Sequence, residues 1–120
     1  MHEMSLASDV VDTVVAAANE FGAEKVFEVH MTVGMGRDIV EDLFEGLFSR
    51  LCRGTIAEGA ELVFVRVPLM VRCNECNTVY SIDVFDDGTW PCPHCKQKNY
   101  VLYSGMEFTV DRVVVDSVAS

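Results

Sequence analysis

Four of the five cysteines stand in two C-x-x-C pairs, Cys73–Cys76 and Cys92–Cys95. Each pair is typical of a tight turn that aims two sulfurs at one point, and two such turns supply the tetrahedron of thiolates that zinc accepts. Because four protein ligands leave no open coordination position, the pattern predicts a structural zinc site and not a hydrolytic one. A segment of about 30 residues builds little core of its own, so the metal would supply much of its folding free energy.

Two other cysteine chemistries compete with this interpretation. A thioredoxin-like redox pair needs only one C-x-x-C, in a βαβ setting. A rubredoxin-like iron centre usually has glycine after the second cysteine of each pair, where this chain has Asn77 and Lys96, and this difference favours zinc. The remaining cysteine, Cys52, lies on the apolar face of a predicted helix and is expected to be a buried, inert thiol.

The amino terminus offers a second set of metal donors. The amine of Met1, the amide nitrogen of His2 and its imidazole can close two fused chelate rings, and the amide or carboxylate of Glu3 can complete a plane. Nitrogen donors in a square suit nickel(II) or copper(II), not zinc. The alternative is an ordinary solvated chain end, and the residues alone leave both interpretations open.

Two stretches of the first half have helical periodicity. The first covers residues 6–21 and is followed by Gly22, which suits the left-handed position after a helix. The second covers residues 38–52 and is predicted to begin with Asp38 as its N-cap, with Glu41 completing a capping-box-like pair.

Extended segments separate and follow these helices. Residues 27–33 alternate between apolar and polar side chains, and residues 61–67 and 106–115 are also predicted strands. Between the cysteine pairs, strand-forming residues within 79–84 and the turn pair Asp87-Gly88 predict a hairpin.

The order helix, strand, helix, strand, cysteine segment, strand predicts an α+β fold. Two helices would pack on a small, about three-stranded sheet, and a zinc-ribbon-like domain would be inserted before the last strand. The expected boundaries are residues 1–70 plus 105–120 for the α+β domain and 71–104 for the insert. Because the final strand returns to the sheet, the insert would be tethered at both ends.

Composition excludes several classes of protein. The chain has 120 residues, 50% of them hydrophobic, and a formal net charge of −10, which argues against binding nucleic acid or an anionic membrane. No apolar run approaches the roughly 20 residues needed to span a bilayer, and the start lacks the features of a secretory signal. We therefore expect a cytoplasmic protein. No nucleophile–base pair or open metal site indicates an enzyme.

With these motifs in place, the sequence resembles the HypA/HybF family, the nickel metallochaperones of [NiFe]-hydrogenase maturation. The stretches that carry the likeness are Met1-His2-Glu3-Met4-Ser5-Leu6-Ala7, Cys52-Arg53-Gly54-Thr55, Glu58-Gly59-Ala60-Glu61-Leu62, both cysteine pairs and Gly105-Met106-Glu107-Phe108. The likeness covers essentially the whole chain. One departure is Gly34-Met35-Gly36-Arg37, which stands where many members carry a different loop with serine.

The resemblance implies a nickel site and a zinc site in one chain. His2 would be the principal nickel ligand, joined by the Met1 amine and the backbone nitrogens of His2 and Glu3, and the four paired cysteines would hold structural zinc. Nickel would be cargo delivered for hydrogenase maturation. The implied partners are a HypB-like GTPase and the [NiFe]-hydrogenase large subunit, and a homodimer is left open.

Two other functions compete with this one. A zinc-ribbon module that binds a protein and handles no nickel would contain zinc alone, whereas a metallochaperone would have one further nickel site. An iron electron carrier would absorb visible light.

Overall fold

The computed structural model describes residues 2–116, apart from the side chain of His2. In chain order the elements are α1 (His2–Glu20), β1 (Val26–Gly34), α2 (Glu41–Cys52), β2 (Glu61–Val67), β3 (Met70–Cys73), β4 (Val79–Ser81), the 3₁₀ turn η1 (Asp87–Thr89), β5 (Tyr100–Ser104) and β6 (Phe108–Val115). This order confirms the predicted succession of helices, strands and cysteine segment.

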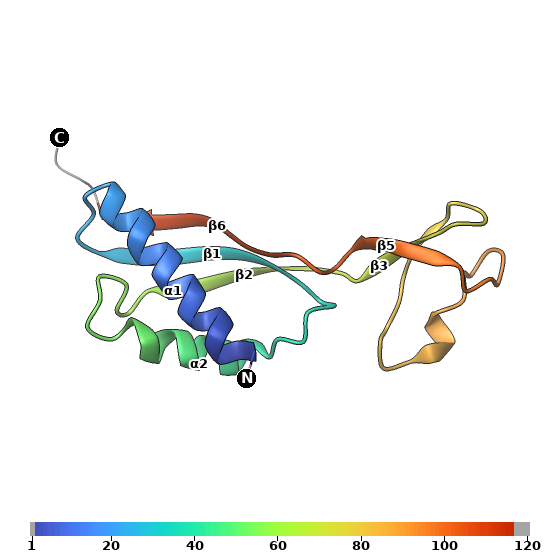
Figure 1. The fold of residues 1–120 in the computed structure, drawn as a ribbon, viewed down its shortest axis with the longest axis horizontal. Coiled ribbons are helices and arrows are strands. Elements are labelled where there is room, and N and C mark those ends of the chain that lie inside the picture. Colours follow the sequence, from blue (N-terminus) through green and yellow to red (C-terminus); the bar gives the residue numbers. More distant parts are fainter. Residues whose placement is uncertain (1, 117–120) are drawn as a thin grey trace. The chain divides into compact units, whose positions relative to one another are not determined.

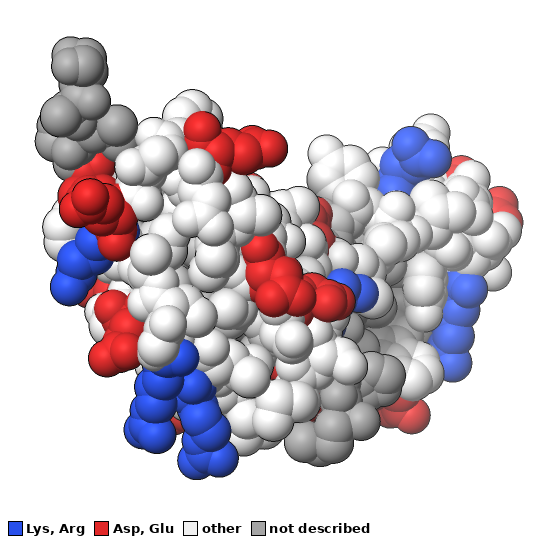
Figure 2. All heavy atoms as spheres, turned by 60° about the vertical axis from the view of Figure 1, so that its left-hand side comes forward, with Lys and Arg blue, Asp and Glu red and all other residues white. Residues whose placement is uncertain are grey.

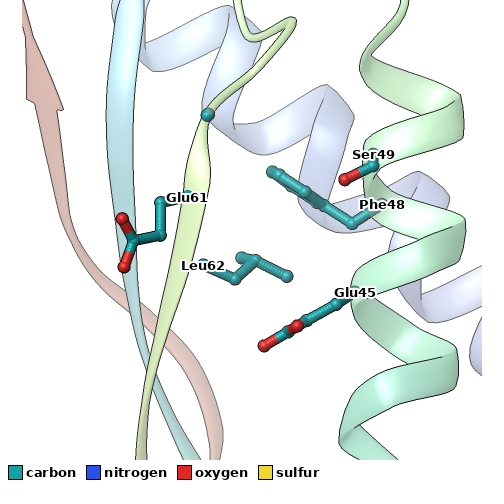
Figure 3. Close-up of a pocket in the computed structure, with 6 residues that line it drawn as sticks. Glu45, Phe48, Ser49, Glu61 and Leu62 are labelled. Atoms are coloured by element: carbon teal, nitrogen blue, oxygen red, sulfur yellow. The ribbon is translucent and has the colours of Figure 1, made fainter.

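A first three-stranded sheet carries the two helices and confirms the predicted α+β class. Its strand order is β2-β1-β6, so the chain returns to β1 after the cysteine segment. Helices α1 and α2 contact each other and lie on the same side of these strands (Figures 1 and 3). Phe44 and Phe48 of α2 are fully buried, and the ring of Phe44 meets that of Phe64 on β2 edge-on at 5.9 Å. Burial of each phenylalanine stabilises the fold by about 1.5–3 kcal/mol.

Helix α1 follows its apolar periodicity and ends as predicted. Its buried side chains recur at intervals of three and four residues and are Ala7, Val10, Val11, Val14 and Ala18. After Glu20, Gly22 adopts a φ of +69° and donates to the carbonyl of Asn19, while the Ala23 N–H donates to that of Ala18. These two bonds form a Schellman motif, and glycine reaches the required left-handed conformation without a Cβ penalty.

The N-cap of helix α2 lies two residues later than predicted. It is Val40, which is extended and makes no side-chain capping bond, so the assignment of Asp38 as N-cap with Glu41 as its partner is wrong. The helix is fixed instead by burial of Phe44, Phe48 and Cys52, which repeat every four residues along one face.

A second three-stranded sheet, in the order β4-β3-β5, carries the cysteine segment. Both pairings are antiparallel, and Val71 on β3 lies opposite Tyr80 on one side and Leu102 on the other. The predicted hairpin between the cysteine pairs is wrong, because β4 pairs with β3 and not with a later strand. Residues 83–90 form a compact loop in place of the hairpin's return strand, and Asp87-Gly88 belong to η1.

The described chain forms two compact units. The first comprises the described residues up to 31, residues 39–65 and those from 109 onward; the second comprises residues 32–38 and 66–108. Within residues 2–116, neither helix has the combined length and apolar character needed to cross a membrane.

Within the second unit, three backbone segments meet at glycines. Gly34 donates to the carbonyl of Glu107 and Gly36 donates to that of Gly105, each at 2.7 Å. A Cβ on Gly34 would overlap the Gly105 carbonyl, and Gly105 itself has a φ of +113° and leaves only 2.5 Å between an added Cβ and Leu69 Cα. The glycine-rich departure from the family pattern therefore lies where backbones approach too closely for any side chain.

We expect Gly34→Ala to lower the free energy of unfolding by about 2 kcal/mol or more, because the added methyl must push backbone atoms apart. Gly46→Ala is the matched control: it lies in α2, where nothing stands within 4 Å of an added Cβ, so it should raise stability by about 0.5–1 kcal/mol. Urea unfolding followed by circular dichroism measures both changes. Wild-type stability in Gly34→Ala would contradict the close approach.

Candidate metal centre

The second unit gathers the four paired cysteines into one cluster. The sulfurs of Cys73, Cys76, Cys92 and Cys95 all lie within 4.8 Å of one another. Across the two pairs, Cys73 Sγ is 3.4 Å from Cys95 Sγ, and Cys76 Sγ is 3.5 Å from Cys92 Sγ. A tetrahedral zinc ion with bonds of about 2.3 Å would separate its sulfurs by about 3.8 Å. The donor set therefore fits a tetrathiolate metal site and does not match an isolated redox pair.

Both cysteine turns have the same backbone construction. Asn77 donates to the carbonyl of Cys73 at 2.9 Å, and Lys96 donates to that of Cys92 at 2.8 Å. Asn77 and Lys96 have φ values of +65° and +67°, the left-handed region that glycine adopts most easily. Asn77 and Lys96 thus adopt the backbone conformation in which a rubredoxin-like turn has glycine. The absence of glycine at these positions therefore does not by itself distinguish a zinc site from an iron site.

Hydrogen bonds and burial divide the protons of the metal-free cluster unevenly. The side chain of Thr78, whose Oγ1 is 3.1 Å from Cys76 Sγ, is the largest cause that lowers the pKa of the Cys76 thiol to about 6. A hydrogen bond from the Gln97 backbone lowers the pKa of the Cys95 thiol. Burial and the other three thiols together raise this pKa by more, so that its net value is about 12. Because neighbouring thiolates repel one another, a divalent cation must displace the remaining protons, and acid must weaken metal binding.

Side chains outside the cysteines hold the cluster together. Asn99 accepts a hydrogen bond from Asn74 at 2.9 Å and donates one to Glu75 at 3.0 Å, which ties the first turn to the segment after the second. Tyr80, which is buried, donates to the carbonyl of Trp90 at 2.8 Å. The sequence analysis missed Asn99, because its partners lie more than 20 residues away and no local pattern marks it.

The fifth cysteine lies outside the cluster, as predicted. Cys52 is fully buried on the inner face of α2, and this burial raises the pKa of its thiol to about 11. The neutral thiol therefore behaves as an apolar core side chain.

The residues of the predicted nickel site are only partly described. Met1 lies outside the described residues, as does the side chain of His2, while the half-buried Glu3 is in the first turn of α1. Of the other histidines, His30 on β1 has protein partners: its Nε2 is 2.7 Å from Glu28 and 3.2 Å from Arg112. His94 is exposed in the second cysteine turn and is a minor cause of the lowered pKa of the Cys76 thiol.

A hollow of about 250 Å³ between α2 and β2 has no comparable set of ligands. In Figure 3 Phe48 and Leu62 project into it and Glu45 extends beside Leu62, whereas Glu61 points to the other side of β2. One carboxylate and the Ser49 hydroxyl make neither a multidentate metal site nor a nucleophile–base pair.

On the face drawn in Figure 2, basic side chains lie in small, separate groups.

Comparisons with known proteins show the family to which the chain belongs. The family model described as hydrogenase/urease nickel incorporation, metallochaperone, hypA matches residues 1–115. The hydrogenase maturation factor HypA of Dehalococcoides mccartyi (strain CBDB1) is 33% identical over 116 residues, which cover 97% of this chain and 95% of the relative. The chain belongs to the HypA family. The HypA of Chlorobaculum parvum is 34% identical, with 97% of this chain and all of the relative covered.

Solved HypA structures share the fold. A solution structure of HypA protein matches with a TM-score of 0.69 at 23% identity over 96% of each chain. The nickel metallochaperone HypA from Helicobacter pylori matches with a TM-score of 0.62 at 20% identity, covering 94% of this chain and 96% of that one. Membership of the HypA family makes this protein a metallochaperone and maturation factor, not an enzyme. That role implies contacts with hydrogenase and with other maturation factors.

We expect Cys73→Ser to abolish stoichiometric metal binding at the four-cysteine cluster and to unfold the β4-β3-β5 sheet, while α1 and α2 persist. Metal analysis, near-ultraviolet circular dichroism of Trp90 and Tyr80, and far-ultraviolet circular dichroism test the three parts. Cys52→Ala is the matched control, because it removes a buried thiol outside the cluster and should retain the metal. Loss of metal in this control would contradict the four-cysteine site.

Thiol labelling of the metal-free protein should separate the cysteines into two classes. Without metal the second unit loses much of its folding free energy, so its four cluster thiols should become accessible to an aromatic disulfide reagent without denaturant. Cys52 lies in the core of the first unit, so it should react only after that unit unfolds. Absorbance of the released thiolate counts the reacted groups. Rapid reaction of all five cysteines in folded protein would contradict the burial of Cys52.

Proposed function

We propose that this chain binds nickel(II) at its amino terminus and delivers it for [NiFe]-hydrogenase maturation, while a structural zinc ion occupies the cysteine cluster. His2 would be the principal nickel ligand, through its imidazole and amide nitrogen, with the amine of Met1 and the amide or carboxylate of Glu3. The observation that carries the proposal is the match of residues 1–115 to a family of nickel-incorporating metallochaperones.

The donor chemistry of the two regions supports a division of labour. Four thiolates around one point leave no vacant position and suit zinc held permanently. Nitrogen donors at a chain end suit nickel in a square plane. We accordingly propose that residues 1–70 with 105–120 serve nickel binding and residues 71–104 serve zinc binding.

The start of α1 favours backbone participation in nickel binding. The helix begins at His2, and the first N–H groups of a helix have no carbonyl partner within the helix. The amide nitrogens of His2 and Glu3 are therefore not needed for helical hydrogen bonds. Because the amine and the amides must lose protons when they bind a metal, nickel affinity should fall as the pH drops.

Delivery requires that nickel can leave. A site of terminal nitrogen donors contains no thiolate, so a recipient with cysteine ligands can remove the metal by stepwise ligand exchange. The proposed recipient is the [NiFe]-hydrogenase large subunit, and the proposed partner in delivery is a HypB-like GTPase. A homodimer is compatible with both steps.

Nickel titration of the zinc-loaded, tagless protein tests the proposal. The wild type should bind one nickel ion per chain, and both His2→Ala and a chain with one extra residue before Met1 should bind at least about tenfold more weakly, a change of about 1.4 kcal/mol. His94→Ala is the matched control, since it removes an exposed histidine from the cysteine turn and leaves the amino terminus intact.

Two results would contradict the proposal. Unaltered nickel affinity in both His2→Ala and the extended chain would exclude the amino terminus as the site. Zinc at one ion per chain, with no nickel bound by the wild type, would instead favour a zinc-ribbon interaction module.

A further inference from the structure

The loop of residues 83–90 exposes a large apolar side chain to water. Phe85 is 93% exposed and its neighbour Val84 is 50% exposed. A single surface apolar residue is ordinary in a folded protein. Here, however, Phe85 and Val84 also line an open hollow of about 400 Å³, together with Met35, Leu69 and Ile82 of the same unit. Phe85 therefore belongs to a group of apolar side chains around one hollow and is not an isolated surface residue.

Hydrogen bonds within the loop hold this surface in one conformation. Asp83 is the hub: its Oδ1 accepts from the N–H of Phe85 at 2.9 Å, and its carbonyl accepts from Trp90 Nε1 at 2.9 Å. Its own N–H donates to Thr89 Oγ1 at 2.8 Å, and that hydroxyl donates to the Asp86 carbonyl at 2.7 Å. The backbone of a loop ordered in this way loses little conformational freedom when the loop binds a partner.

The charged side chains of the loop itself have one sign. Residues 83–90 contain three aspartates, Asp83, Asp86 and Asp87, and no lysine, arginine or histidine. In the described structure these carboxylates form no ion pair, and the Asp87 carboxylate makes no hydrogen bond. A complementary surface would bury the phenylalanine ring in an apolar socket and place basic side chains around it.

We propose that the 83–90 loop is a docking element for a partner protein that offers an apolar socket bordered by lysine or arginine side chains. The choice of candidate partners rests on the proposed function, which supplies the hydrogenase large subunit and the GTPase. The three aspartates disfavour an anionic membrane, and they would repel the same loop of a second copy of this acidic chain.

The test measures binding of the zinc-loaded full chain to two purified probes, the hydrogenase large-subunit precursor and the HypB-like GTPase of the same organism. Phe85→Ala should weaken binding to at least one probe about tenfold or more, because truncating a central aromatic anchor removes most of its contribution. Asp87→Asn should weaken the same complex about threefold and reduce its salt dependence.

Phe21→Ala is the matched control. Phe21 is 74% exposed in the first unit, so its truncation removes an equally large apolar side chain and should leave binding to both probes unchanged. Zinc content and thermal unfolding of Phe85→Ala should equal those of the wild type, because the side chain packs against little of its own protein.

Several results would overturn the docking proposal. One is that Phe85→Ala binds both probes with the affinity of the wild type. Another is that the wild type binds neither probe measurably. The third is that Phe21→Ala loses as much affinity for the probes as Phe85→Ala does. It is also overturned if Phe85→Ala abolishes only self-association in sedimentation, or only binding to phosphatidylglycerol vesicles. Nickel titration distinguishes failure of the docking proposal from failure of the proposed function. Phe85→Ala should still bind nickel, and His2→Ala should still bind the probes.

Discussion

Repulsion among four cysteine sulfurs is the constraint on which the second unit depends. Their sulfurs lie within 4.8 Å of one another, a spacing at which four thiolates cannot coexist without a cation. Apart from these cysteines, the buried core of this sheet consists of little more than Val71 and Tyr80. A unit with so few buried side chains gains much of its folding free energy from metal binding. A cation bound by the four thiolates would therefore stabilise the sheet to which the loop with Phe85 belongs.

The proposed nickel site obeys the opposite requirement. A structural metal should remain bound, which four converging thiolates and the hydrogen bonds of Asn99 favour. A transferred metal must leave, which a few nitrogen donors at a chain end would permit. Under this proposal the residue types would separate the two metals chemically, and neither site would need a catalytic group.

Local signals in the sequence were reliable where one interaction decides the structure. Gly22 predicted the end of α1, because only a left-handed residue completes the Schellman motif. The strand predicted at residues 61–67 has the same bounds in β2. The start of α2 was not predictable from Asp38, because burial of Phe44 and Phe48 against other elements determines where that helix lies. The hairpin failed for a similar reason, since internal bonds of the 83–90 loop replace strand pairing.

By itself the sequence determined the family, the fold class and the chemistry of the cysteine site. The cysteine site depends on ligand types at short spacings, and the fold class depends on the periodicity of short segments. Both kinds of signal are local, so they can be identified without knowing which distant segments meet. Only the tertiary structure decided that Gly34 and Gly105 must lack side chains, that Asn99 clamps the first cysteine turn, and that Phe85 faces water. Each of these depends on which distant segments meet, and the periodicity and motifs of a single sequence do not encode such long-range contacts.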